Sequence, residues 1–318
     1  LYAVAFILMQ QGVMGVTTGV VLAFLNYMGL FSTPLTQLSA IIQNLAQVSA
    51  NLERIFETID APVSIADSDD SVDLDKVSGQ IDFDNVTFCY DEGVNILEHF
   101  DLHVKPGERI ALVGPTGAGK TTVINLLTRF YDVKEGSVRI DGEDVRKIRL
   151  KSLRSKVGVL MQDPFIFKGT VMENIRYGKP DATDEECIAA AKATFADACI
   201  ERLPNGYNEM LQERGEGLSA GEKQLISFAR IIVKNPSVII LDEATSSISS
   251  DTEKLIQQAL EIILKGRTSF IVAHRLSTIR NADRILFIAN KGIAEEGSHE
   301  QLLKAHGLYY NLYKSLNQ

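Results

Sequence analysis

Hydrophobic residues dominate the start of the chain, and residues 1–52 contain no acidic, basic or histidine side chain. This uncharged stretch is longer than the roughly 20 apolar residues that span the hydrocarbon core of a bilayer. Polar residues at 10–12 and 17–19 interrupt it, so residues 1–9 are predicted to end one membrane span and residues 19–59 to form the next helix. At 1.5 Å per residue the second helix is about 60 Å long and should project beyond the membrane. Pro34 is expected to kink it.

Polar side chains follow one face of this second helix. Asn26, Thr33, Gln37 and Asn44 are spaced by 7, 4 and 7 residues, which places them on one narrow stripe. The stripe has two interpretations. It is either the wall of a water-accessible translocation path or a set of hydrogen bonds between neighbouring membrane helices.

The pattern changes after residue 59. Residues 60–79 are acidic and serine-rich with little apolar content, and they are predicted to be a linker. Short β-rich runs then alternate with helical stretches, which predicts an α/β fold in which helices cover a sheet. The predicted strands are 81–88, 109–113, 137–140, 157–161, 238–241, 268–272 and 284–289. Residues 163–218 lack strand patterns, and their two predicted capping boxes, beginning at Thr170 and Thr183, indicate a helical insert.

Charge and cysteine content exclude several classes of function. The chain has 32 Lys and Arg against 41 Asp and Glu, a net charge of −9, which disfavours binding of nucleic acid. The cysteines Cys89, Cys187 and Cys199 have no metal-ligand spacing, which argues against a zinc site or a disulfide scaffold. Because the chain begins inside an apolar run without Met, we expect it to be the C-terminal part of a longer protein.

A glycine-rich loop follows the predicted strand 109–113 and precedes a helical stretch at 123–130. This strand-loop-helix context is typical of a phosphate loop, whose backbone N–H groups and helix dipole bind phosphates. Lys120 is expected to reach the β and γ phosphates, and Thr121 to offer its hydroxyl to Mg²⁺. The predicted nucleotide-binding loop consists of Gly114, Pro115, Thr116, Gly117, Ala118, Gly119, Lys120, Thr121 and Thr122.

Two carboxylates end the apolar strand at 238–241. Adjacent anions repel each other unless a cation compensates, so Asp242 and Glu243 indicate a metal-nucleotide site. We expect Asp242 to assist the Mg²⁺ shell and Glu243 to polarise the attacking water. Capping of the next helix explains one of these acids but explains the pair poorly.

The segment Leu218-Ser219-Ala220-Gly221-Glu222-Lys223-Gln224 resembles the signature motif of ATP-binding cassette (ABC) proteins. Residues 80–318 match the family pattern in order, which implies an ABC nucleotide-binding domain of the P-loop NTPase class. Its parts would be a RecA-like core, a β subdomain and a helical subdomain at about 163–235, preceded by an all-α transmembrane segment at 1–59. The resemblance implies that Tyr90 stacks on adenine, Gln162 links the γ-phosphate and Mg²⁺ to the transmembrane domain, and His274 contacts the γ-phosphate. Residues 213–215 look like the exporter segment that touches the coupling helices.

Ser219 and Glu222 stand in the spacing of a capping box, so a helix at 220–233 should begin with free N–H groups, which bind anions. In the family, Ser219 and Gly221 would face the nucleotide held by a partner domain. Ala220, Glu222 and Ser249 depart from the usual signature glycine, signature glutamine and the aspartate that follows the carboxylate strand. All three positions act on the partner's site, which favours a catalytically complete half of a heterodimer. A homodimer that tolerates the variation is the alternative.

The resemblance implies an exporter half that binds ATP and Mg²⁺ and hydrolyses ATP to drive transport. It implies a multi-pass protein of the cell membrane, in contact with lipid, with a cytoplasmic nucleotide domain. A non-transport ABC ATPase is disfavoured by the apolar residues 1–52, and an importer ATPase by the fusion of span and cassette. An ATP-gated channel or regulator stays open as a third reading, and the transported substrate is not predicted.

Overall fold

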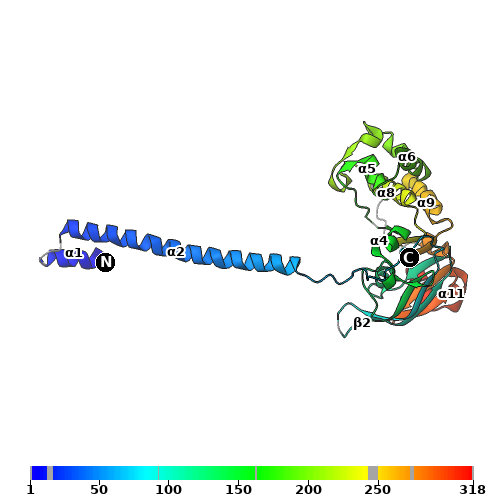
Figure 1. Cartoon of the computed structure of the whole chain (residues 1–318), viewed down its shortest axis with the longest axis horizontal. Coiled ribbons are helices and arrows are strands. Elements are labelled where there is room, and N and C mark those ends of the chain that lie inside the picture. Colours follow the sequence, from blue (N-terminus) through cyan, green and yellow to red (C-terminus); the bar gives the residue numbers. More distant parts are fainter. Residues whose placement is uncertain are drawn as a thin grey trace. The chain divides into compact units, whose positions relative to one another are not determined.

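The computed structural model describes residues 2–12, 17–91, 93–161, 163–242, 250–272 and 276–316. It divides into two compact units, Leu1–Ser64 and Ile65–Gln318. The first unit holds α1 (Tyr2–Gln10) and α2 (Thr18–Ile59), close to the predicted bounds (Figure 1). Thr17 caps α2 by accepting a hydrogen bond from the Val20 amide, and the helix continues through Pro34. Helix α2 is long and apolar enough to cross a membrane, and none of its described residues is buried.

Among the described residues, the second unit contains a six-stranded and a four-stranded sheet. The larger sheet has the order β12-β11-β3-β10-β9-β6 and is parallel except for β12, and the smaller one, β2-β1-β4-β5, is antiparallel. The strands are β1 (Ile81–Cys89), β2 (Asn95–Val104), β3 (Arg109–Val113), β4 (Glu135–Ile140), β5 (Glu143–Asp144), β6 (Val157–Leu160), β9 (Val238–Asp242), β10 (Thr268–Val272), β11 (Arg284–Ala289) and β12 (Gly292–Gly297). Strands β3, β10 and β11 have the predicted bounds, whereas β2 and β12 had no predicted counterpart.

Helices from two stretches of the sequence, one between β6 and β9 and one between β9 and β10, form a separate lobe. Figure 1 shows α5, α6, α8 and α9 gathered together, away from β2 and α11. The bounds are α5 (Val171–Arg176), α6 (Asp184–Ala193), α7 (Asp197–Ile200), α8 (Ala220–Lys234) and α9 (Ser250–Leu264). The capping boxes predicted at Thr170 and Thr183 are both present. The prediction that this insert lacks strands was wrong, because β7 (Gly169–Thr170) pairs with β8 (Met210–Leu211), and two-residue strands have no detectable period.

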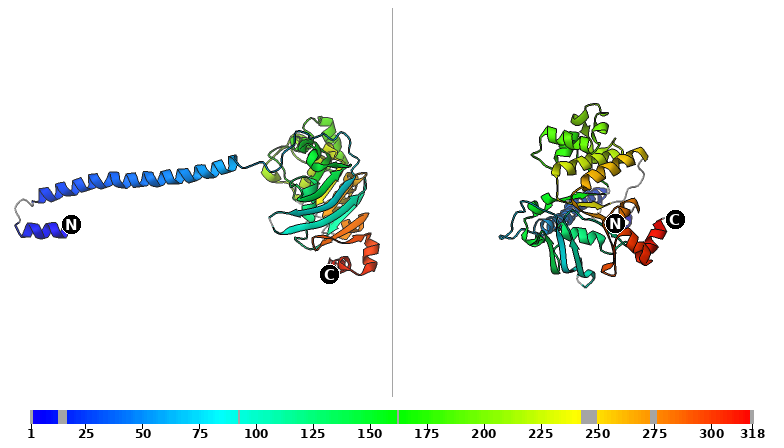
Figure 2. Two further views of the ribbon diagram at one scale, coloured as in Figure 1. Left: turned by 60° about the horizontal axis from the view of Figure 1, so that its bottom comes forward. Right: turned by 90° about the vertical axis from the view of Figure 1, so that its right-hand side faces the viewer.

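The remaining helices lie around the sheets. They are α3 (Lys120–Leu127), α4 (Leu150–Lys156), α10 (Leu276–Arg280), α11 (His299–Ala305) and α12 (Leu308–Leu316), with 3-10 turns at Val145–Lys147, Gly206–Asn208 and Glu213–Gly215. Figure 2 shows the C-terminal helices in red beside one another. Helix α3 begins before the predicted residue 123, because left-handed Gly119 caps it, and it ends before residue 130.

The larger sheet separates two hydrophobic cores. Along β3, Ala111 and Val113 belong to the core beneath the helical lobe, whereas Ile110 and Leu112 belong to the core shared with the smaller sheet. The other parallel strands alternate in the same way, as the period of two residues requires. The strand that leads into the phosphate loop is therefore held from both faces.

Residues 66–80, which we name the strap, lie against the second unit although their composition predicts a linker. Val72 forms a parallel bridge with Ile148, and the Asp67 carboxylate accepts a hydrogen bond from the Leu150 amide at 2.8 Å. At the other end, the Asp141 carboxylate accepts the backbone N–H groups of residues 78–80. Polar contacts thus hold this segment, which has few apolar residues, against the rest of the second unit. Composition alone does not reveal these contacts.

Candidate nucleotide-binding site

The phosphate loop joins β3 to α3 with a backbone that only glycine adopts freely. Gly114, Gly117 and Gly119 have φ values of 141°, 80° and 105°. A Cβ at Gly114 would lie 2.2 Å from the carbonyl oxygen of Ile288, so this position also lacks room for a side chain. The loop therefore presents bare backbone, as close contact with phosphate oxygens requires.

Lys120 lies at the first position of α3 and is 9% exposed. Its Nζ donates hydrogen bonds of 2.8 Å to the carbonyl oxygens of Gly114 and Pro115. Burial lowers the pKa of this ammonium, and the nearby Asp242 carboxylate opposes the shift. An ammonium has three donors, and two of them bond to neutral carbonyl oxygens here. Negatively charged phosphate oxygens would be stronger acceptors for this cation.

The other loop residues lie where the motif predicts them. Pro115, Thr116 and Gly117 are exposed, and Ala118 is half-buried. Thr121 is exposed in the first turn of α3, whereas Thr122 in the same turn is buried.

Tyr90 follows β1 immediately and packs against the phosphate-loop helix. Its Oη shares a 3.2 Å hydrogen bond with Thr122 Oγ1 and accepts a 3.0 Å bond from Asn125 Nδ2. The ring makes edge contacts with Phe88 and Tyr131, with centroids 4.9 and 5.0 Å away, and 44% of the residue stays exposed. The structure thus brings the predicted adenine-stacking residue to the predicted phosphate site.

Asn125 and Tyr131 were missed by the sequence reasoning. Asn125 lies three residues after Thr122 on the same helix, and this i,i+3 spacing is a signal that could have placed it beside Tyr90. Tyr131 lies beyond the end of α3, and its contact depends on the fold of β1 against that helix. Sequence spacing alone contains no signal for it.

The carboxyl ends of the central parallel strands meet at one edge of the sheet. Val272 on β10 pairs with Leu112 on β3 and with Asp242 on β9, so the phosphate loop and Asp242 leave the sheet on the same side. Thr121 supplies a hydroxyl and Asp242 a carboxylate, both oxygen ligands that suit Mg²⁺. In the described part of the chain no cluster of three or more His, Cys, Asp or Glu side chains could hold a metal. This donor set fits a magnesium ion that takes its other ligands from phosphates and water.

Three predicted site residues lie outside the described residues, namely Gln162, Glu243 and His274. In the sequence each follows a strand of the larger sheet: β6 ends at Leu160, β9 at Asp242 and β10 at Val272. Ser249 is also outside the described part. Their predicted roles stay predictions.

The predicted capping box opens α8. The Ser219 hydroxyl accepts a 3.3 Å bond from the Glu222 amide, and the Ser219 amide donates a 2.9 Å bond to the Glu222 carboxylate. Ser219 is exposed at the helix start, and Gly221 is buried in its first turn. Glu222 is thus occupied as a cap, and Arg202 lies 3.5 Å from its carboxylate.

Comparison with known proteins shows which family combines these features. The family model described as ABC transporter matches residues 97–246, which include the phosphate loop, the signature segment and the carboxylate strand. The chain belongs to the ABC transporter family. ATP binding is what this family membership implies for the loop around Lys120, and the predicted fold class is confirmed.

Other ABC transporters resemble the chain over most of its length. It is 46% identical over 300 residues to the ABC transporter ATP-binding protein YknV of Bacillus subtilis (strain 168), covering 94% of this chain and 50% of that protein. It is 43% identical over 298 residues to the ATP-dependent lipid A-core flippase of Syntrophus aciditrophicus (strain SB), covering 94% and 49%. A solved structure of a bacterial Atm1-family ABC exporter with ATP bound superposes with a TM-score of 0.77 at 38% identity, covering 94% of this chain and 52% of that one. The chain spans about half the length of these ABC transporters.

Proposed function

We propose that this ABC transporter chain is the ATP-binding and ATP-hydrolysing part of an exporter half, which couples closure of two nucleotide domains to movement of a substrate across a membrane. The observation that carries the proposal is the buried Lys120 ammonium inside a glycine loop, in the same chain as an exposed apolar helix of 42 residues. The glycine loop with its buried ammonium suits a nucleoside triphosphate, and the apolar helix suits a lipid bilayer.

Each residue of the site has a proposed task. Tyr90 stacks on the adenine, and the loop N–H groups with Lys120 bind the phosphates. Thr121, Gln162 and Asp242 hold Mg²⁺, which when bound would neutralise phosphate charge. Glu243 orients and polarises the attacking water, and His274 and Gln162 contact the γ-phosphate side of the site. These tasks separate binding from hydrolysis, because the loop binds phosphates without help from Glu243.

We further propose that two such halves face each other, with the Ser219 and Gly221 end of α8 completing the partner's site. The free N–H groups at the start of a helix favour an anion, which supports this task. A heterodimer is favoured because Ala220, Glu222 and Ser249, the residues that depart from the family pattern, would all act on the partner's nucleotide. Substrate-stimulated, Glu243-dependent ATPase activity of the purified full-length protein as a single chain type would instead establish the homodimer.

The nucleotide domain is proposed to lie in the cytoplasm, where ATP is available, and the whole protein to cross the membrane several times. An ATP-gated channel or regulator is the alternative from another class. It would bind ATP through the same loop but would need no sustained hydrolysis. Glu243 favours the exporter, and transport measured in sealed vesicles distinguishes the two.

The proposal is tested by two substitutions in the full-length protein. Glu243→Gln should retain ATP binding and lower hydrolysis by orders of magnitude, because the phosphate loop stays intact. Lys120→Ala should weaken ATP binding itself. Binding of a fluorescent ATP analogue and release of phosphate are measured on the same samples, and near-normal turnover of Glu243→Gln would refute the assignment.

A further inference from the structure

The strap follows the apolar helix α2 in the sequence, and residues 60–65 separate it from the end of that helix at Ile59. Residues 66–70 are exposed, so few apolar contacts hold this part of the strap. Its attachment is polar: Asp67 accepts the Leu150 amide, and the Val72 amide donates a 2.8 Å bond to the carbonyl oxygen of Lys147. A segment held by a few exposed hydrogen bonds opens more readily than a packed core.

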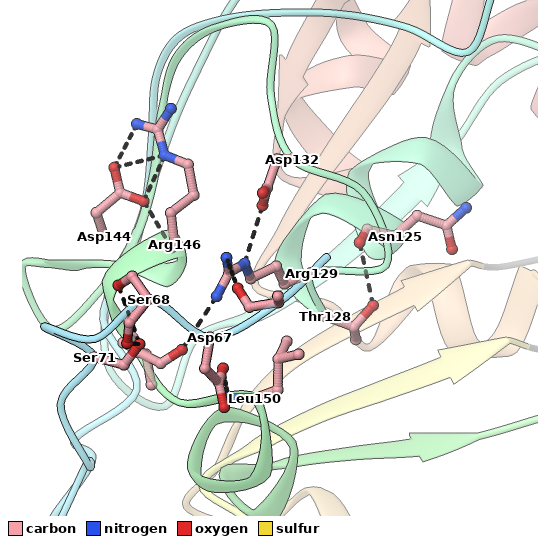
Figure 3. A network of polar contacts seen from close by, with 12 residues as sticks. Asp67, Ser68, Ser71, Asn125, Thr128, Arg129, Asp132, Asp144, Arg146 and Leu150 are labelled. Atoms are coloured by element: carbon pink, nitrogen blue, oxygen red, sulfur yellow. Dashed lines mark hydrogen bonds and ion pairs between the residues drawn. The ribbon is translucent and has the colours of Figure 1, made fainter. Parts of the chain in front are cut away.

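Arg129 provides a different kind of attachment. It lies two residues after α3 ends and adopts a left-handed φ of 50°. Its side chain is 4% exposed, and its guanidinium reaches three separate segments (Figure 3). Nη2 donates to the carbonyl oxygen of Ala66 at 3.1 Å, Nη1 to that of Ile148 at 3.3 Å, and Nε to the Asp132 carboxylate at 3.0 Å.

The geometry of this contact requires arginine. A guanidinium presents its donors in a rigid planar fork, so it bonds several acceptors in fixed directions at once. A lysine ammonium is a compact point charge and does not reproduce the three directions. Loss of an acceptor by a buried cation destabilises the fold. The position of the strap and the position of the Arg129 side chain therefore depend on each other.

Helix α3 connects the phosphate loop to Arg129. Helix α3 begins at Lys120 and runs to Leu127, a rigid segment of about 12 Å. Because this helix is short and continuous, a ligand that displaced its first turn would also move the residues at its end. Arg129 therefore joins the start of the nucleotide site to the segment that leads to α2.

We infer that Arg129 is a positioning residue that couples the phosphate-loop helix to the strap, so that nucleotide binding at the loop changes how firmly residues 66–72 are attached. This inference rests on the proposed ATP site. It adds a direct connection along the chain between that site and the apolar helix, independent of any contact made by other segments of the protein.

The test uses the full-length protein in lipid nanodiscs and hydrogen exchange of the peptide covering residues 66–72. In the wild type, ATP should change the exchange rate of this peptide. In Arg129→Gln the peptide should exchange roughly tenfold faster without ATP, because a hydrogen bond from a charged group is lost, and the response to ATP should disappear. The KM for ATP should stay within about threefold of the wild type, because the loop itself is intact.

Two further variants make the result decisive. Asp67→Ala removes an exposed attachment of the strap without touching the buried arginine, so it should fold normally and also weaken the response to ATP. Lys179→Gln is the matched control, because its ion pair with Glu186 joins two half-exposed side chains in the helical lobe and should leave the response unchanged. An unaltered ATP response in both Arg129→Gln and Asp67→Ala, or a wild-type strap that ignores bound ATP, overturns the inference. Absence of ATP binding by the wild type would instead overturn the proposed function.

Discussion

Gly114 shows how little space the phosphate loop leaves for a side chain, since a Cβ would contact the Ile288 carbonyl oxygen. Gly114→Ala should lower the free energy of unfolding by about 2 kcal/mol and weaken ATP binding, because overpacking against backbone displaces the loop. Denaturant unfolding and ATP titration measure both effects. Gly142→Ala is the control, since Gly142 has a similar left-handed backbone but open space around it. Equal losses in the two variants would contradict the steric argument.

The hydrogen bond between Tyr90 and Asn125 predicts a shared contribution to nucleotide affinity. Tyr90→Phe and Asn125→Leu should each raise the KM for ATP by about threefold with kcat unchanged, because each removes the bond that fixes the ring. The double variant should be no worse than Tyr90→Phe alone, since Tyr90→Phe already removes the bond to Asn125 together with the one to Thr122. Additive effects in this cycle would show that the two residues act separately. Tyr177→Phe, in the helical lobe, serves as the control for loss of a phenol.

Cysteine reactivity should follow burial. Burial raises the pKa of Cys199 to about 11 and also raises that of Cys187, so at pH 7.5 both hold less thiolate than an ordinary cysteine. A maleimide should therefore label half-buried Cys89 first, and the other two only as the protein unfolds. Because Cys89 precedes Tyr90, ATP should slow its labelling. Peptide mass spectrometry measures each site, and rapid labelling of Cys199 in the folded protein would contradict the expectation.

Residue-level prediction from sequence succeeded where one local motif defines the geometry. The glycines and Lys120 lie within a few consecutive residues, so their arrangement follows from the loop itself. Tyr131 and Arg129 acquire their contacts only when distant segments pack together. Such contacts depend on the tertiary fold, which spacing along the chain does not encode.

At the scale of the element, α8 depends on its first turn. Ser219→Ala should lower the free energy of unfolding by about 1 kcal/mol, because the Glu222 amide loses its acceptor. Glu222→Gln should cost less, since glutamine also completes a capping box. Chemical denaturation of matched samples measures the difference. A Ser219→Ala variant as stable as the wild type would show that the cap is dispensable.

Strands formed by short apolar runs were predicted well, whereas a strand whose buried and exposed residues alternate was missed. Strand β3 is a short apolar run and has its predicted bounds, whereas β2 alternates buried residues with exposed polar ones such as Asp101 and His103. The strap was predicted as a linker because its composition is polar. Its order comes from acceptors such as Asp141, which lie far away in the sequence.

At the scale of the whole molecule, both hydrophobic cores lie within Ile65–Gln318. A fragment of residues 65–318 should therefore fold alone and bind ATP. A fragment of residues 81–318 lacks the strap and should be less stable by about 3 kcal/mol or more, since it loses several hydrogen bonds. Thermal melting and ATP titration of the two fragments test this, and equal stability would show that the strap contributes nothing to folding.

The alternation of β3 between two cores restricts how this chain can vary in length. Adding or removing one amino acid inside the strand would send Ile110 and Leu112 to the wrong side and bring Ala111 and Val113 in their place. Large side chains would then overpack one hydrophobic core, and small side chains would leave cavities in the other. Insertions are thus tolerable in surface turns such as the one at Gly142, but the strand beneath the phosphate loop must keep its five residues.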